Sequence, residues 1–345
     1  MAGAETILDV RDLVVEYAAD DVNVRAVDRV SLQLRRGEFL GVVGESGCGK
    51  STLCFAIAQL LSPPAEIVEG SVIFHGKNLV LLREKQLRRL RWRDYSVVMQ
   101  SAMNALNPVM TVGQQLTDAI LAHEQVSSRE AKLRGGAVLQ LVGIDPAHLR
   151  SYPHQLSGGM RQRAMIAMAL VFTPELIIMD EPTSALDVVA QRSLMVQIQD
   201  LQRELGFAVM FVTHDMSLVG RFSQRLAIMY AGDIVEMAGT TEIFHNPKHP
   251  YSRGLLQAFP SARGPRRPLQ GIPGNPPDLR YPPPGCRFQP RCPHAMPICE
   301  TAVPPPYAPR GDDLVRCYLY EPSVAGSQQP AFSSPAGRDG LGTDG

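Results

Sequence analysis

The sequence predicts an α/β fold with a mostly parallel β-sheet core, and three observations support this prediction. Short runs of apolar, often β-branched residues alternate with segments of helical periodicity between residues 38 and 237. A glycine-rich loop separates the first of these runs from the helical segment that follows it. Proline and glycine crowd residues 260–309, so we expect a small, loop-rich appendage there instead of a second large core.

The first third of the chain predicts antiparallel strands beside the core. Residues 7–17 alternate apolar and polar side chains and predict an edge strand, and residues 24–34 predict its hairpin partner. Residues 68–74 predict another strand. Residues 82–93 carry six Arg and Lys side chains, with leucines at near-helical spacing. This pattern indicates a solvated helix face, and a nucleic-acid patch is the alternative.

The rest of the core predicts alternating helices and strands. Residues 95–100 predict a short strand, and residues 111–149 predict two or three amphipathic helices interrupted at Gly135–Gly136. The further predicted elements are a helix that opens at residues 156–160 and runs to about 172, a strand at 176–180, a helix at 188–205, a strand at 207–212 and a closing hairpin at 224–237. Because parallel strands need such crossovers, we expect helices on both faces of the sheet.

Charge and hydropathy exclude several classes of protein. Lys+Arg and Asp+Glu both number 34, so no net charge indicates a nucleic-acid partner. No stretch reaches the roughly 18 uninterrupted apolar residues of a membrane-spanning helix. Residues 1–9 show no basic head followed by an apolar run, so we expect a cytosolic protein without a secretory signal. In that reducing compartment, the six cysteines argue against a disulfide framework.

One continuous stretch predicts a binding site for a nucleoside triphosphate. Residues 44–51 fit the pattern G-x-x-x-x-G-K-[ST] in full, between a short strand at 38–43 and a helix at 50–61. Glycines let backbone N–H groups turn toward the phosphates, and the helix N-terminus adds partial positive charge. Lys50 is expected at the β- and γ-phosphates, and the Ser51 hydroxyl at Mg²⁺. The predicted nucleotide contacts are Gly44, Glu45, Ser46, Gly47, Cys48, Gly49, Lys50, Ser51 and Thr52.

Two carboxylates follow a second apolar strand. Asp180 and Glu181 come directly after residues 176–179, at the sheet edge where the glycine loop is expected. Asp180 is predicted to hold Mg²⁺, directly or through water, and Glu181 to polarise an attacking water molecule. Adjacent surface acids are the alternative.

A second glycine pair precedes another helix and is part of a resemblance to a known protein family. Ser157, Gly158 and Gly159 form an anion site by the same helix-terminus argument, yet one ATP has only one γ-phosphate. Here residues 5 to about 258 closely resemble the ATP-binding cassette (ABC) family of P-loop ATPases. The resemblance implies an antiparallel β subdomain and a helical subdomain beside the core sheet. It also implies that residues 156–160, the signature, cap the ATP of a partner subunit in a head-to-tail dimer.

The resemblance assigns further residues. Gln100 matches the glutamine that contacts Mg²⁺ and water and senses the transmembrane partner, and residues 184–187, ending in Asp187, match the loop that crosses the dimer interface. His214 matches the histidine that contacts the γ-phosphate. Tyr17 matches the aromatic that stacks on adenine, and a core tyrosine is the alternative.

Within the family the chain resembles ATPase subunits of dipeptide and oligopeptide importers. The stretches that carry this likeness are residues 104–109, 249–256, 271–279, 285–288 and 290–293. Met160 stands where glutamine is commonest, and Ser101–Ala102 replace a frequent Asp-Pro, which puts only fine contacts in doubt. The resemblance implies a peripheral ATPase on the cytoplasmic face of the membrane. Its partners would be a second, different ATPase subunit, two transmembrane permease subunits and an extracytoplasmic substrate-binding protein.

Other functions remain open at this point. A soluble ABC ATPase of DNA repair or of ribosomes is the main rival, but no long coiled coil is inserted and only one cassette is present. An importer ATPase for nickel or a sugar is a second alternative. We expect an ABC domain at residues 1–258 with its helical subdomain at about 104–172, a Pro/Cys-rich region at 259–322 and a disordered tail at 323–345.

Four late cysteines indicate a metal site. Cys286, Cys292, Cys299 and Cys317 lack the paired spacing of a zinc ribbon or the run of a ferredoxin. A segment poor in core residues gains stability from a metal staple, so a metal is still favoured. The resemblance implies a [4Fe–4S] cluster, with zinc or plain thiols as the alternatives.

Overall fold

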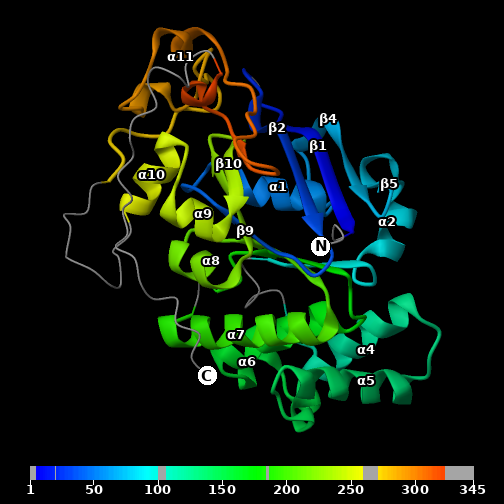
Figure 1. The fold of residues 1–345 in the computed structure, drawn as a ribbon. Coiled ribbons are helices and arrows are strands. Elements are labelled where there is room, and N and C mark those ends of the chain that lie inside the picture. The colour runs from blue at the N-terminus through cyan, green and yellow to red at the C-terminus, as the bar shows by residue number, and fades with distance from the viewer. Residues whose placement is uncertain (1–4, 20, 100–105, 184–185, 259–270, 323–345) are drawn as a thin grey trace.

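The computed structural model describes residues 5–19, 21–99, 106–183, 186–258 and 271–322. These residues form two sheets, a layer of helices and a loop-rich C-terminal region (Figure 1). Gln100, the Ser184–Ala185 pair and the tail from residue 323 lie outside the described residues. Among the described helices, none combines the length and the apolar character needed to cross a bilayer.

The main sheet is mostly parallel, as predicted. Its seven strands follow the order β11-β10-β9-β3-β8-β7-β6, in which β9, β3, β8, β7 and β6 are parallel and β10 runs antiparallel to both of its neighbours, β9 and β11. The strands are β3 (Phe39–Val43), β6 (Tyr95–Val98), β7 (Leu176–Asp180), β8 (Ala208–Val212), β9 (Arg225–Tyr230), β10 (Asp233–Gly239) and β11 (Leu314–Val315).

The four-stranded second sheet is antiparallel, in the order β2-β1-β4-β5. Its strands are β1 (Thr6–Tyr17), β2 (Val24–Arg35), β4 (Ala65–Phe74) and β5 (Lys77–Asn78). The hairpin of β1 and β2 is confirmed, but the prediction that β1 is an edge strand is wrong. It pairs with β4 along its other side, from Leu8↔Phe74 to Tyr17↔Ala65.

Helices cover both faces of the main sheet. The α-helices are α1 (Lys50–Ile57), α2 (Glu84–Leu90), α4 (Val112–His123), α5 (Ser128–Leu141), α6 (Gly158–Leu170), α7 (Val188–Leu205), α8 (Met216–Phe222), α9 (Thr240–His245), α10 (Pro250–Gln257) and α11 (Pro297–Thr301). Short 3₁₀ turns occupy Leu79–Leu81, Pro146–Arg150, Pro153–Gln155, Gln289–Arg291 and Tyr318–Tyr320. The four helices α4 to α7 gather in one layer below the sheets (Figure 1).

The predicted helix break at Gly135–Gly136 is wrong, because α5 runs through both glycines. A Cβ on Gly135 would lie 3.4 Å from Leu116, and one on Gly136 would lie 3.5 Å from Leu149. Both distances are ordinary van der Waals contacts, so neither glycine is required by the packing and neither interrupts the helix.

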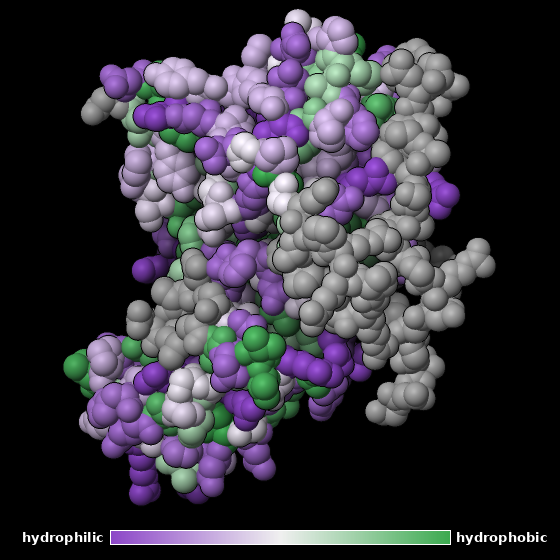
Figure 2. Space-filling model, turned by 90° about the vertical axis from the view of Figure 1, so that its left-hand side faces the viewer, coloured by the Kyte–Doolittle hydropathy of each residue, from purple (hydrophilic) through white to green (hydrophobic). Residues whose placement is uncertain are grey.

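The continuous apolar strands reflect burial on both faces. In β8, Val209 and Phe211 point into the core shared with the helical layer, while Met210 and Val212 point into the core shared with α1 and the antiparallel sheet. In a space-filling view, the lower part of the molecule shows a patch of apolar side chains among hydrophilic ones, and the top is mostly hydrophilic (Figure 2).

Strand pairing and aromatic packing both attach the C-terminal region to the main core. Strand β11 extends the main sheet by pairing with β10 through Glu236↔Val315 and Met237↔Leu314. Phe288 is buried in the main core, edge-on to Tyr230 and Tyr251. Among its described residues, the region has a small apolar cluster of its own at Val315, Cys317 and Leu319.

Candidate nucleotide site

The glycine loop runs from the end of β3 to the start of α1, and two of its glycines are sterically required. Gly49 has a φ of +101°, and a Cβ there would lie 2.1 Å from the carbonyl oxygen of Ala26. A Cβ on Gly44 would lie 2.1 Å from the carbonyl oxygen of Met229. The loop thus has the tight, open-backbone form that a phosphate cradle needs.

Lys50 begins α1 and folds back onto the loop. Its buried ammonium donates to the carbonyl oxygens of Gly44 (2.8 Å) and Glu45 (2.9 Å) and approaches Cys48 Sγ at 3.7 Å. The charge is therefore held within the loop, next to the backbone groups that would surround a phosphate.

Asp180 ends β7 and is buried beside α1. Burial raises the pKa of its carboxyl, and a hydrogen bond with Ser51 opposes this rise. Within the described residues, Asp180 Oδ1 has no hydrogen-bond partner although it is buried. An orphaned carboxylate oxygen beside a serine hydroxyl fits Mg²⁺, which prefers hard oxygen ligands.

Glu181 and His214 meet at the ends of two adjacent strands. His214 Nδ1 lies 3.1 Å from Glu181 Oε1. The Glu181 side chain is only 17% exposed, whereas His214 is 66% exposed. Glu181 also has a φ of +46°, and its N–H donates to the Val212 carbonyl, so the backbone is held in a strained conformation at this position.

Tyr17 lies at the edge of the loop region. Its hydroxyl is 3.1 Å from Thr52 Oγ1 in α1, so the end of β1 is fixed against the helix that follows the loop. The structure therefore brings Tyr17, residues 44–52, Asp180, Glu181 and His214 into one part of the molecule.

The signature lies elsewhere. Ser157 caps α6 by accepting a hydrogen bond from the Met160 N–H at 3.3 Å, and Asp187 caps α7 by accepting from Ala190 N–H at 2.9 Å. Helix α6 belongs to the layer below the sheets, whereas the loop and α1 lie above (Figure 1). A Cβ on Gly159 would meet none of the described atoms within 4 Å, so this helix start is open.

Sequence reasoning missed contacts to the loop from α10 and from the C-terminal region. The Glu45 side chain pairs with Arg291, and the Glu45 N–H donates to the Tyr251 hydroxyl at 3.0 Å. Both partners lie in stretches that carry the family likeness, but the local sequence pattern does not predict that they contact the loop.

The four late cysteines converge without forming a ready ligand set. Burial raises the pKa of Cys286 to about 11 and that of Cys317 to about 12, and the neighbouring thiols add to both shifts. Cys286 N–H also donates to the Cys299 carbonyl at 2.8 Å. However, no three His, Cys, Asp or Glu side chains in the described part of the chain are placed to hold one metal ion. The donor chemistry fits a metal, and the side-chain placement does not.

Family comparisons agree with this geometry. The ABC transporter family matches residues 27–184, and the oligopeptide/dipeptide transporter C-terminal region matches residues 235–299. A solved dimeric ATP-binding cassette in a post-hydrolysis state, bound to ADP and Pi, superposes with a TM-score of 0.61 at 28% identity. That superposition covers 68% of this chain and 98% of the solved chain.

Relatives of known family match over nearly the whole chain. A probable peptide ABC transporter ATP-binding protein of Sinorhizobium fredii is 47% identical over 305 residues, covering 87% of this chain and 91% of the relative. The dipeptide transport ATP-binding protein of Bacillus subtilis is 42% identical, covering 92% and 96%. The oligopeptide transport ATP-binding protein of Escherichia coli is 44% identical, covering 87% and 90%. The chain therefore belongs to the family of ATP-binding proteins of the dipeptide and oligopeptide ABC transporters.

Proposed function

We propose that this protein is the ATP-hydrolysing subunit of an importer for dipeptides or oligopeptides. The observation that carries the proposal is the meeting of Asp180, Glu181 and His214 beside the phosphate loop. The family membership and the names of the relatives support the peptide substrate.

The residues of the site divide the chemistry among them. Lys50 would donate to the β- and γ-phosphate oxygens in place of its present carbonyl partners. Ser51 and Asp180 would hold Mg²⁺, with Gln100 expected beside them, and the ion supplies charge neutralisation at the phosphate oxygens.

Glu181 would orient the attacking water and accept its proton. As the water oxygen bonds to the γ-phosphorus, the bond to the β–γ bridging oxygen breaks, and ADP and phosphate are formed. His214 would contact the γ-phosphate while its hydrogen bond keeps the Glu181 carboxylate in place. The tyrosine ring of Tyr17 would stack on adenine.

The second ATP contact would come from a partner cassette. Because residues 157–159 lie in the helical layer, we propose that they cap the ATP on the loop of a second ATPase subunit in a head-to-tail pair. Asp187 would stand at that interface. We propose that the partner is a different subunit, so that the pair is a heterodimer. Two permease subunits would hold it at the cytoplasmic face of the membrane by contacting residues 100–108. An extracytoplasmic binding protein would deliver the substrate to them.

Reconstitution of the transporter tests this function. The protein would be purified with its permease and partner ATPase subunits, placed in liposomes with the binding protein, and assayed for ATP hydrolysis and uptake. Peptide should stimulate hydrolysis and be transported, and Lys50→Ala should abolish both. If only Ni²⁺ or a sugar stimulates ATP hydrolysis, that compound and not a peptide is the substrate. Failure to co-purify with membrane subunits would favour a soluble ABC ATPase.

We further propose that the four late cysteines hold a [4Fe–4S] cluster, supported by the resemblance to importer ATPases and by the thiol donors of a region with little core of its own. Anaerobic purification with iron, sulfide and zinc analysis tests it, beside a Cys292→Ser/Cys299→Ser variant. About four irons per chain and a visible chromophore lost in the variant are expected. Zinc alone would assign a zinc site, and neither metal would leave plain thiols.

A further inference from the structure

The phosphate loop is held from outside by the C-terminal region. Arg291 Nη1 donates to both carboxylate oxygens of Glu45, the second residue of the loop, at 3.0 and 3.2 Å. The same guanidinium donates from Nε to the Pro273 carbonyl (2.8 Å) and from Nη2 to the Ile272 carbonyl (3.3 Å). Arg291 thereby links the loop to two segments of the C-terminal region.

This ion pair is shielded from water. The Arg291 side chain is 6% exposed and that of Glu45 is 24% exposed. Arg291 also donates to the hydroxyl of buried Tyr230 at 3.3 Å. A buried, multiply bonded guanidinium has a fixed geometry, and a charge-assisted pair of this kind is stronger than an exposed surface pair.

A neighbouring hydrogen bond holds the loop backbone. Tyr251 in α10 accepts the Glu45 N–H at 3.0 Å, and its ring packs against Tyr230 and Phe288. The Glu45 backbone is therefore bonded to this aromatic cluster directly, and its side chain is linked to the cluster through Arg291, which donates to Tyr230.

A second arginine of the region supports the far side of the loop. Arg287 binds Asp28 and the Ala231 carbonyl. The adjacent Gly232 N–H donates to the Cys48 carbonyl at 2.9 Å. The loop is thus braced at both ends, at Glu45 and at Cys48.

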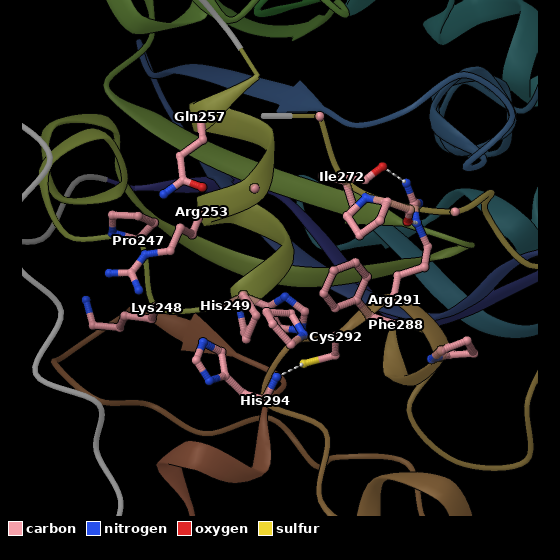
Figure 3. Close-up of a pocket in the computed structure, with 17 residues that line it drawn as sticks. Pro247, Lys248, His249, Arg253, Gln257, Ile272, Phe288, Arg291, Cys292 and His294 are labelled. Atoms are coloured by element: carbon pink, nitrogen blue, oxygen red, sulfur yellow. Dashed lines mark hydrogen bonds between the residues drawn. The ribbon is translucent and has the colours of Figure 1, made fainter. Parts of the chain in front are cut away.

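Glu45 poses an electrostatic problem that Arg291 solves. A carboxylate in a loop that binds phosphates repels the ligand unless it is neutralised or turned away. The cavity of about 520 Å³ between α10 and the C-terminal region has Arg291 at its edge, beside Ile272 (Figure 3). From this edge the guanidinium reaches the Glu45 carboxylate and neutralises its charge.

We propose that Arg291 is a positioning residue of the nucleotide site, which neutralises Glu45 and fixes the phosphate loop against the C-terminal region. This inference rests on the proposed role of the loop in binding ATP. It makes the C-terminal region part of the nucleotide-binding machinery.

Binding of MgATP and MgADP to the full-length chain, measured by calorimetry beside the melting temperature, tests the proposal. Arg291→Gln should raise the Kd for ATP about tenfold and the Kd for ADP less, because ATP carries more charge near Glu45. Glu45→Gln/Arg291→Gln removes the unpaired carboxylate and should bring the ATP Kd back to within about threefold of wild type. A role in folding alone would lower the melting temperature of both variants without this recovery.

Two further variants keep the test decisive. Arg291→Lys retains the charge and should weaken ATP binding only about threefold, even where Arg291→Gln fails to fold. Arg280→Gln removes an exposed arginine of the same region that pairs with Asp278, and should leave binding unchanged.

The proposal is overturned if folded Arg291→Gln binds ATP with the wild-type Kd, or if the double variant binds no better than Arg291→Gln. If Arg291→Gln does not fold, the other two variants decide the question. The proposal is then overturned if the double variant or Arg291→Lys has a Kd for ATP at least tenfold above that of the wild type. Lys50→Ala separates the proposal that the loop binds ATP from the proposal that Arg291 positions the loop. If Lys50→Ala still binds ATP, the loop is not the nucleotide site; if it does not and Arg291→Gln binds normally, only the positioning role fails.

Discussion

Glu181 and His214 form a hydrogen-bonded pair across neighbouring strands, with 3.1 Å between Oε1 and Nδ1. The pair stands at the carboxyl ends of β7 and β8, where open α/β sheets place their ligand sites. The left-handed backbone of Glu181 turns its side chain out of the strand direction and toward His214. This hydrogen bond therefore couples the base and the γ-phosphate sensor of the proposed mechanism.

Glu181→Gln should leave ATP binding intact and slow hydrolysis by about 10²–10⁴-fold, because the amide keeps the shape but cannot take a proton. Nucleotide binding and phosphate release, measured on the same preparation, check this. Glu204→Gln, an exposed carboxylate at the end of α7, is the matched control. Near-wild-type hydrolysis in Glu181→Gln would remove this residue from the mechanism.

Asp180→Asn should raise the Mg²⁺ concentration for half-maximal hydrolysis about tenfold or more, since the variant loses the charge that fits the ion. Hydrolysis titrated against free Mg²⁺ measures the shift. Asp200→Asn changes an exposed carboxylate on α7 and should behave as wild type. An unchanged Mg²⁺ requirement in Asp180→Asn would place the ion elsewhere.

The loop and the two acids after β7 could be predicted from sequence because each is a contiguous motif tied to a strand end. The parallel strands could also be predicted from the sequence, since burial on both faces produces unbroken apolar runs. The partner of β1 was not, because pairing with β4 depends on contacts about 60 residues apart in sequence that leave the same alternating pattern. The Arg291–Glu45 pair, separated by 246 residues, leaves no local signal at all.

Gly49→Ala should both weaken ATP binding and destabilise the fold. The new Cβ would meet Ala26 O at 2.1 Å, in a residue already at positive φ, so the loop must shift. Gly206→Ala is the matched control. It has a φ of +75° but no described heavy atom within 4 Å of the new Cβ, so only the backbone strain of about 1–2 kcal/mol applies.

Urea unfolding and ATP titration of both glycine variants separate strain from collision. We expect Gly206→Ala to lower the free energy of unfolding and to keep its ATP affinity. Equal losses of stability in the two variants, with ATP affinity retained in both, would mean that the contact with Ala26 relaxes at no cost.

His249 should make the protein less stable in mild acid. Burial lowers the pKa of its imidazole to about 3, and its Nδ1 accepts the Tyr251 N–H at 3.0 Å, so the ring is neutral in the folded state. The unfolded chain, with an ordinary histidine pKa near 6.5, takes up a proton as the pH falls below that value. The stability that this group contributes is complete above about pH 6.5 and is lost progressively from there toward pH 3.

His249→Asn isolates this contribution, because asparagine also accepts a hydrogen bond at a helix N-cap and does not titrate. Between pH 7 and pH 5 the wild type should lose about 2 kcal/mol more of unfolding free energy than the variant. The exposed His245→Asn serves as the control and should follow the wild-type profile. Parallel pH profiles for wild type and His249→Asn would show that His249 protonates in the folded protein as readily as in the unfolded chain.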